Sequence, residues 1–331
     1  MLKLKNVGIK AILSCVPDKV YSIKNYKNQF GDKRIDKIIN NTGISKKRIA
    51  DFKINSSDLC LDASLKLFEK LKFDKLKIDG LVFVSQTRDY IMPQTSFILK
   101  NKLGLKDSVI CFDLPLGCTG FIQGLYQSSM MINSGLNNVL LLCGDTINKY
   151  LKNDDISTLS VFGDGVSACI VEKNKSDMFF NIKTCPEKYD SIIMNKSFRE
   201  DLIMKSKELH MDGLEVFNFV IKYIPKIIRE DLLFLGKNVD DIDNLFFHQA
   251  NGFIINYLNK SLKLEPSKSP IVLDGFGNTG SSSIPLAITE TLFKKSKGKT
   301  ILCGFGVGLS YGTCYVNLVD TKLFKTQIYN K

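Results

Sequence analysis

The order of strands and helices occurs twice along the chain, and this repeat constrains the fold more than any other feature of the sequence. Each half contains a buried strand, a helix, a second strand, a turn rich in glycine, a second helix and a third strand. We expect these elements at 79–85, 93–103, 109–112, 113–120, 121–134 and 138–143 in the first half, and at 243–248, 253–262, 271–273, 275–280, 281–293 and 300–303 in the second. A repeat at about half the chain length predicts two similar α/β units.

Alternating strands and helices also predict the architecture of each unit. They favour mixed, largely parallel sheets whose faces are covered by helices, which is an α/β fold. Further elements are expected outside the repeat: a strand over 6–16, a helix from Ser57, a strand over 166–171, a long helix over 212–233 and a final strand over 312–319. The polar run 172–177 indicates the boundary between the units, which we predict to span 1–173 and 174–331.

Charge and composition exclude several classes of protein. The chain has 331 residues, of which 44% are hydrophobic and 24% charged, as in an ordinary soluble globular protein with a large core. Its net charge of +12 comes from 46 Lys and Arg against 34 Asp and Glu, and indicates either a solvated lysine-rich surface or an acidic partner. No basic run interleaved with aromatic residues points to nucleic acid. No apolar run approaches the roughly 18 residues that span a bilayer, so no membrane association is expected.

The nine cysteines indicate a reducing compartment. They include no C-x-x-C pair and only two histidines accompany them, so a zinc site is not expected. Cys143, Cys169 and Cys303 lie in apolar strand-like runs, where burial is the simplest account. The first five residues alternate like a strand and lack the long apolar segment of a signal peptide. We therefore predict a cytoplasmic protein without a metal ion.

One cysteine lies in a setting suited to a nucleophile. Cys118 follows the strand 109–112 and stands at the start of a helix, where unpaired N–H groups and the helix macrodipole stabilise a thiolate. The neighbouring Gly117 and Gly120 let other atoms approach the sulfur closely. The alternative is that Cys118 is a small buried apolar residue, like most free cysteines.

The second half contributes polar residues at corresponding places. His248 ends a buried strand, where α/β folds place active sites, or it is a satisfied core histidine. Asn278 lies among glycines, a setting typical of a turn residue. The glycine-rich run 304–308 has no helix of its own after it, which disfavours a dinucleotide site, but its N–H groups could form an oxyanion hole. His210, in a polar segment before a helix, is expected to be structural or solvent-exposed.

Together these motifs resemble the Cys-His-Asn triad of the β-ketoacyl-acyl-carrier-protein synthase III family, within the thiolase superfamily. The matching stretches are Gly-Cys-Thr-Gly-Phe at Cys118, His-Gln-Ala-Asn at His248 and Gly-Asn-Thr at Asn278. Supporting stretches occur in the same order over nearly the whole chain, at 42–44, 162–165, 211–217 and 305–312. The resemblance implies a thiolase-like fold, in which duplicated halves form a five-layer αβαβα sandwich, and a homodimer.

The resemblance also implies a role for each residue. Cys118 would take an acyl group from a thioester of coenzyme A or acyl-carrier protein, while the N–H groups of Cys118 and Val307 hold the oxyanion. His248 and Asn278 would bind the thioester carbonyl of malonyl-acyl-carrier protein as CO₂ is lost, and the carbanion would attack acyl-Cys118 to give a β-ketoacyl thioester. No cofactor is implied. The residues implied in substrate binding are Met92, which would reach across the dimer to the partner's acyl pocket, and Phe162, Phe253, Lys260, Phe305 and Gly306.

Departures from the family pattern bear on the substrate. The Trp and Arg that often surround the adenine of coenzyme A are replaced by Lys37 and Asn41, and the chain contains no Trp. Phe253 stands where an Arg often follows the His-Gln-Ala-Asn motif, whereas Lys260 matches a basic carrier-docking position. We therefore expect an acyl chain delivered on an acidic carrier protein, which a charge of +12 attracts.

Two other functions stay open at this point. A relative that transfers the acyl group from Cys118 to an oxygen or nitrogen acceptor, in a specialised-metabolite or surface-glycan pathway, would explain the altered coenzyme A site. A non-catalytic carrier-binding protein is the other alternative, against which the complete Cys-His-Asn set argues. The principal prediction is a decarboxylative condensing enzyme, acting in fatty-acid synthesis or in a dedicated pathway.

Overall fold

Two sheets and their surrounding helices make up the computed structural model, which describes residues 1–194, 208–293 and 298–329. The first sheet has six strands, in the spatial order β15 (Lys322–Tyr329), β2 (Val7–Pro17), β8 (Gly165–Lys173), β7 (Asn138–Asp145), β5 (Gly80–Val84) and β6 (Ile110–Leu114). The second has five, in the order β1 (Leu2–Leu4), β9 (Met178–Thr184), β14 (Ser310–Asn317), β13 (Lys299–Gly306) and β12 (Asn244–Phe247). Each sheet contains parallel and antiparallel pairs, so both are mixed, as predicted.

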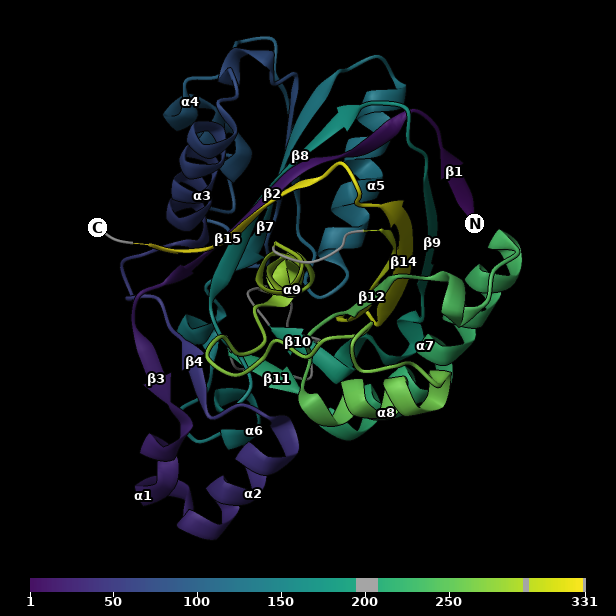
Figure 1. Ribbon diagram of the computed structural model, residues 1–331. Coiled ribbons are helices and arrows are strands. Elements are labelled where there is room, and N and C mark those ends of the chain that lie inside the picture. The colour runs from purple at the N-terminus through teal and green to yellow at the C-terminus, as the bar shows by residue number, and fades with distance from the viewer. Residues whose placement is uncertain (195–207, 294–297, 330–331) are drawn as a thin grey trace.

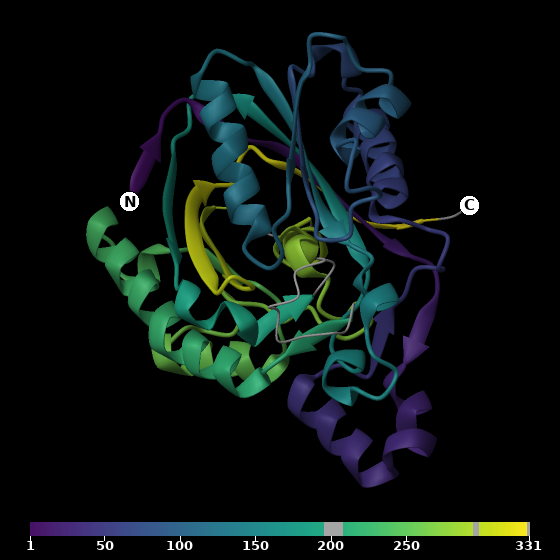
Figure 2. The same cartoon turned by 180° about the vertical axis from the view of Figure 1, so that it is seen from behind.

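Helices separate the sheets and cover their outer faces (Figure 1; Figure 2). The central helices, α5 (Gly120–Asn133) and α9 (Ser283–Thr291), pack between the sheets. The outer face of the first sheet is covered by α3 (Ser56–Leu71) and α4 (Thr95–Leu103), and that of the second by α7 (Gly213–Leu235) and α8 (Gly252–Leu262). The predicted five-layer αβαβα sandwich is confirmed. Shorter helices, α1 (Lys27–Phe30), α2 (Asp32–Thr42) and α6 (Ile156–Leu159), lie at the lower end of the view in Figure 1.

Burial explains why central and outer helices have different sequence patterns. The central α9 buries every residue from Ser283 to Thr289, because it contacts both sheets. The outer α3 buries Leu59, Ala63 and Leu67, spaced along one face of the helix, and leaves the opposite face to solvent. Within the described residues, none of the helices combines the length and the apolar character needed to cross a lipid bilayer.

The terminal strands tie the two halves together. β1 pairs with β9 in the second sheet and β15 pairs with β2 in the first, so each end of the chain completes the sheet of the other half. The two ends lie on opposite sides of the molecule (Figure 1). The expected boundary at residues 173 and 174 falls between β8 and β9, where the chain passes from one sheet to the other. The division into units 1–173 and 174–331 stays a prediction.

One element of the predicted repeat is wrong, because residues 271–273 form no strand. Pro270 has no N–H group to donate to a ladder, and the side-chain amide of Gln249 takes the place of a backbone partner. Gln249 Nε2 donates to the Pro270 carbonyl at 3.4 Å, and the Val272 N–H group donates to Gln249 Oε1 at 2.8 Å. A side chain therefore holds this segment near the end of β12, which remains an edge strand of its sheet.

Some local expectations also change. His210 is exposed, as predicted, but lies in a strand, β11 (Leu209–Met211), which pairs with β10 (Ile192–Met194). The helix expected from Ser57 begins at Ser56, because Asn55 and Asp58 form a capping box. The sequence analysis predicts neither β9 nor β15, nor the short pair β3 (Val20–Ser22) and β4 (Lys46–Arg48). Lysines interrupt the apolar pattern in β9, β15 and β4, which explains why periodicity alone misses them.

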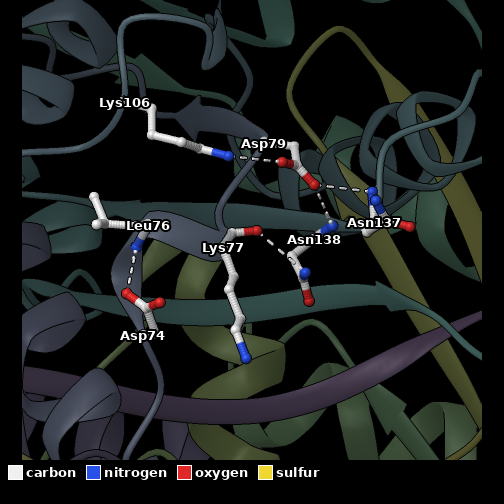
Figure 3. Close-up of polar contacts among 7 residues, drawn as sticks. All are labelled: Asp74, Leu76, Lys77, Asp79, Lys106, Asn137 and Asn138. Atoms are coloured by element: carbon white, nitrogen blue, oxygen red, sulfur yellow. Dashed lines mark hydrogen bonds and ion pairs between the residues drawn. The ribbon is translucent and has the colours of Figure 1, made fainter.

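A carboxylate holds the amino ends of parallel strands in each half. Asp79 accepts hydrogen bonds from the N–H groups of Asn137 and Asn138, where β7 begins, at 3.0 and 3.2 Å (Figure 3). In the second half Asp243 accepts from the Lys299 N–H group, where β13 begins, at 2.7 Å. The two aspartates thus occupy equivalent places in the repeat, at the edge of the sheets remote from Cys118.

Replacing Asp79 by asparagine should destabilise the fold by about 1–3 kcal/mol at neutral pH, because a partly buried carboxylate that accepts three hydrogen bonds becomes an amide whose nitrogen cannot accept. Burial raises the pKa of this carboxyl, but the bonds from Asn137, Lys106 and Asn138 outweigh burial and hold the pKa below its usual value. A lowered folded-state pKa gives stability at neutral pH that is lost as the pH falls through that pKa.

Urea unfolding of the parent and of the Asp79→Asn variant measures this effect. The difference in unfolding free energy between the parent and the variant should be smaller at about pH 3 than at about pH 7. At about pH 3 the Asp79 carboxyl is protonated in the unfolded chain, so the folded state gains less from keeping it ionised. Asp107→Asn, at an exposed position before β6, is the matched control. A difference that stays constant over this range would contradict the assignment.

Candidate active site

Seven of the predicted site residues line one cavity between the two halves of the chain. They are Cys118, Phe162, His248, Asn278, Phe305, Gly306 and Val307. Most of the remaining lining is apolar, from Ile147, Ile192, Leu209, Met211, Val216 and Ala250, and it also includes Gln86, Asp145 and Gly280. The structure therefore brings the predicted thiol, imidazole and carboxamide together in one largely apolar pocket.

Sheet topology explains how residues far apart in sequence meet here. Cys118 follows β6, which is parallel to β5, and β5 is parallel to β7. His248 and Val307 follow β12 and β13, which are also parallel to each other. Loops at the carboxyl ends of parallel strands lie at the same edge of a sheet. Gln86, after β5, and Asp145, at the end of β7, reach the cavity for the same reason, and this position is the signal by which the sequence could have identified them.

Burial keeps the Cys118 thiol protonated at neutral pH. Cys118 lies two residues before α5, as predicted, but the expected lowering of the thiol pKa is wrong. Burial raises the pKa of Cys118 to about 11, and the N–H group of Val307 opposes this only in part. The carboxyl of Asp145 raises the pKa further. The desolvation of a thiolate here therefore outweighs the helix terminus.

Two backbone N–H groups, those of Cys118 and Val307, act on the Cys118 sulfur. Gly306 has a φ of +152°, and a β-carbon there would lie 2.7 Å from the sulfur, so only glycine fits. The hydroxyls of Thr119 and Ser310 lie 2.9 Å apart, and Ser310 Oγ donates to the Val307 carbonyl at 2.7 Å. These contacts hold the Val307 turn beside the start of α5, an arrangement suited to an oxyanion hole.

His248 is buried and uncharged at neutral pH. Burial lowers the pKa of His248 to about 3, and the backbone of Gly280 opposes this in part. Its Nδ1 lies 2.7 Å from Ser283 Oγ, so Nε2 is the ring nitrogen that faces away from that hydroxyl. The Phe305 ring lies edge-on to the imidazole, with ring centroids 5.5 Å apart. A neutral imidazole held this way offers one hydrogen bond without bringing a charge into the pocket.

The backbone and the side chain of Asn278 are both fixed. Its N–H group donates to the Val161 carbonyl at 2.8 Å, and its carbonyl accepts from the Gly163 N–H group at 3.0 Å. Its side-chain Oδ1 accepts from the Gly280 N–H group at 3.0 Å. The amide nitrogen is left as a donor at the cavity that Asn278 lines.

A buried lysine supports the turn to which Asn278 is bonded. Lys47 Nζ donates to the Phe162 carbonyl at 2.9 Å and to Asn148 Oδ1 at 2.6 Å. Asn148 Nδ2 donates in turn to the buried Asp164 at 2.9 Å. Burial lowers the pKa of Lys47 to about 8, with Asp164 opposing the shift. The sequence gives no sign of this role, because Lys47 stands in a run of basic residues typical of a solvated surface.

Three predicted substrate-binding residues lie outside this cavity. Met92 is 81% exposed, in the loop between β5 and α4. Phe253 is 55% exposed and Lys260 is also exposed, and both belong to α8, which begins four residues after His248. Their predicted roles require a partner molecule, a second subunit for Met92 and a carrier for the α8 residues.

The described residues form no group of three or more His, Cys, Asp or Glu side chains that could hold a metal ion. All nine cysteines are free.

The sequence and the structure both match known proteins. The family described as 3-oxoacyl-[acyl-carrier-protein (ACP)] synthase III matches residues 112–185, and its C-terminal part matches residues 234–318. A β-ketoacyl-[acyl-carrier-protein] synthase III of Fusobacterium nucleatum is 33% identical over 326 residues, covering 95% of this chain and 99% of the relative. The crystal structure of a 3-oxoacyl-(acyl-carrier protein) synthase from Burkholderia xenovorans superposes with a TM-score of 0.95 at 31% identity, covering 99% and 98% of the two chains. A synthase III structure from Pseudomonas aeruginosa gives a TM-score of 0.85 at 26% identity, covering 95% and 98%.

Alkylation of Cys118 should become faster with pH without levelling off below about pH 9, because the thiolate fraction rises roughly tenfold per pH unit below a pKa of about 11. Iodoacetamide labelling followed by peptide mass spectrometry measures the rate at each cysteine. A Cys118→Ser variant gives the background from the other thiols. A rate that already levels off near neutral pH would mean that the helix terminus lowers the pKa of Cys118 by more than burial raises it.

Proposed function

The chain belongs to the 3-oxoacyl-[acyl-carrier-protein] synthase III family, and we propose that its cavity performs the decarboxylative condensation of that family with Cys118, His248 and Asn278. As a member it is an acyltransferase, a condensing enzyme of the β-ketoacyl synthase III type. The observation that carries the residue assignment is the convergence of these three side chains and two backbone amides on one apolar cavity.

In the first half-reaction Cys118 takes the acyl group. Its sulfur attacks the thioester carbonyl, the bond to the donor sulfur breaks, and the thiol proton ends on the released donor thiol. Negative charge develops on the carbonyl oxygen during the attack, and the N–H groups of Cys118 and Val307 stabilise it there. Because the resting thiol is neutral, the pocket gains this charge only as the bond forms.

In the second half-reaction His248 and Asn278 bind the carbonyl of malonyl-acyl-carrier protein. When the carboxylate leaves as CO₂, its bonding electron pair becomes an enolate whose charge lies on the carbonyl oxygen. His248 Nε2 and Asn278 Nδ2 donate to that oxygen, which lowers the barrier. The enolate carbon then attacks acyl-Cys118, and the sulfur leaves as a thiolate that takes a proton from solvent, giving a β-ketoacyl thioester.

The exposed face of α8 is the proposed docking site for the acyl-carrier protein. Phe253, Tyr257 and Lys260 follow one another at four- and three-residue spacing and are all exposed, so they lie on one face. Phe253 stacks against Phe217 of α7, with ring centroids 5.3 Å apart. An aromatic surface beside a lysine suits a carrier that presents both apolar and acidic side chains, and the charge of +12 speeds its approach.

The same proposal includes a cytoplasmic location and no resident cofactor. Nine unpaired cysteines suit a reducing compartment. Both half-reactions use only side chains, backbone amides and the two thioester substrates.

Replacing Asn278 by alanine should separate the two half-reactions. Acylation of Cys118 should persist, because the oxyanion of that step is held by backbone amides, while release of CO₂ from malonyl-acyl-carrier protein should slow by about 10²–10³-fold. Intact-protein mass spectrometry reports the acylation, and a coupled CO₂ assay reports the decarboxylation. Asn101→Ala, at an exposed position on α4, is the matched control.

Loss of both steps in Asn278→Ala with the fold intact would contradict the assigned role. A different contrary result, in the parent protein, is acyl-Cys118 that persists in the presence of malonyl-acyl-carrier protein and passes its acyl group to an alcohol or amine. That result would identify the protein as an acyltransferase acting on oxygen or nitrogen. A Cys118→Ala variant must gain no acyl mass in either case.

The proposed homodimer forms along β6, the edge strand of the first sheet. Ile110 is 48% and Phe112 41% exposed there, and the nearby loop exposes Ile91 and Met92. An apolar edge strand exposed to water favours pairing with another strand, and a twofold axis lets one β6 pair with the β6 of a second copy. This arrangement would bring the exposed Met92 loop close to the partner subunit.

A Phe112→Lys variant should be monomeric, because two lysines would meet at the proposed twofold interface without a counter-ion. Sedimentation velocity of the parent and the variant measures the change. Leu233→Lys replaces an 83% exposed leucine at the end of α7 and is the matched control, expected to leave the dimer intact. A parent protein that sediments as a monomer at micromolar concentration would contradict the proposal.

A further inference from the structure

A second chamber adjoins the Cys118 cavity. The two share Gln86, Ile147, Ile192, Leu209 and Val307 in their walls, so they are directly adjacent. The cavity volume is about 60 Å³ in the first chamber and about 250 Å³ in the second. An acyl group on Cys118 that outgrows the smaller first chamber therefore extends toward the second.

The second chamber contains a charged group that its apolar walls do not explain. Arg88 lines it together with Ile193, Met194 and Pro115, and is the only arginine or lysine among the described residues that line either chamber. No acidic side chain in the described part of the chain lies within ion-pair distance of Arg88. An arginine side chain presents a positive charge and a planar fork of N–H donors.

Gln86 adds a second polar group between the chambers. Its backbone N–H group donates to Asp145, but its side-chain amide makes no hydrogen bond to any described residue. The amide packs over Gly117, where a β-carbon would lie 2.5 Å from Gln86 Oε1. Asp145, the one carboxyl among the described residues of these walls, accepts hydrogen bonds at Oδ1 from Ser85, Gln86 and Thr87 and forms no ion pair with Arg88.

From this arrangement we infer that the acyl group carried by Cys118 ends in a carboxylate, which Arg88 binds in the second chamber with Gln86 beside the chain. The inference rests on the proposed function, because it names the acyl group of the first half-reaction. A partly buried guanidinium without a counter-ion is costly, and a carboxylate matches its paired N–H donors in geometry and charge. A purely aliphatic acyl group would cover Arg88 and leave that charge uncompensated.

The chemistry of transfer is unchanged by this assignment. The distal carboxylate stays intact, the thioester bond at the other end of the acyl group breaks, and the new bond forms to Cys118. The thiol proton leaves on the donor thiol, as before. Donors of this class are half-thioesters of dicarboxylic acids, so the reaction that supplies them must activate one carboxyl of such an acid and leave the other free.

Competing acylation of Cys118 by succinyl and isocaproyl N-acetylcysteamine thioesters tests the inference. The two acyl groups have the same chain length and similar size, but succinyl ends in a carboxylate and isocaproyl in an isopropyl group. The short N-acetylcysteamine thiol removes any contribution from coenzyme A or a carrier. Peptide mass spectrometry measures the ratio of succinylated to isocaproylated Cys118. The parent should favour succinyl by about ten- to a hundredfold, the range expected for charge-assisted hydrogen bonds.

The variants locate the source of the preference. Arg88→Met should bring the ratio close to one, and Arg88→Lys should restore part of it. Arg34→Met, at an exposed position on α2, should keep the ratio of the parent. Isocaproyl acylation of the parent without a succinyl preference would overturn the inference and leave the proposed function standing. Failure of every thioester, including acetyl, to acylate Cys118 would overturn both. The ratio in the parent alone decides the matter if Arg88→Met does not fold.

Discussion

Two backbone hydrogen bonds hold Asn278, the proposed catalytic asparagine of the second half, on the first half of the chain. They join Asn278 to Val161 and Gly163, and form a single bridge between strands at Phe162. A β-carbon at position 163 would collide with the Phe276 carbonyl. The turn at Gly163 can therefore approach the turn before Asn278 this closely only because residue 163 is glycine. Lys47 and Asp164 support this contact from beneath, at the cost of burying a charged pair. The position of Asn278 relative to the other groups of the cavity depends on this junction.

The thiol and the imidazole in the resulting cavity are both uncharged until substrate enters it. Burial raises the pKa of Cys118 and lowers that of His248, so neither carries a charge at neutral pH. Donors fixed in a pocket of low polarity stabilise a developing charge more strongly than water does, and they need no reorganisation. Both proposed half-reactions place their new charge on an oxygen, next to such donors. Arg88 is the exception, since it brings a permanent charge, and for that reason it is the residue that points most directly to the substrate.

Sequence reasoning predicted the architecture well because the repeat leaves few arrangements of the chain. Two copies of one strand and helix order require two sheets, and the carboxyl ends of their parallel strands bring Cys118 and His248 to neighbouring edges. The apolar pattern wrongly predicted a strand at residues 271–273, where the Gln249 side chain rather than a neighbouring strand is the hydrogen-bond partner. It also missed β9 and β15, whose apolar pattern is interrupted by lysines.

The electrostatic properties of the site could not be predicted in the same way. The position of Cys118 before a helix suggested a lowered pKa, but the desolvation that reverses it depends on Phe305, Val307 and other walls far away in sequence. Lys47 and Arg88 resemble ordinary surface residues in the sequence, and only the folded structure shows one buried and the other lining a cavity.

A crystal structure of the protein with an acyl group trapped on the nucleophile tests the central claim most directly. The account predicts electron density for a thioester on Cys118, with its carbonyl oxygen within hydrogen-bonding distance of the N–H groups of Cys118 and Val307. The imidazole of His248 and the amide nitrogen of Asn278 should face the empty space next to it. An acyl group on another cysteine, or a carbonyl oxygen turned away from both amides, would contradict it.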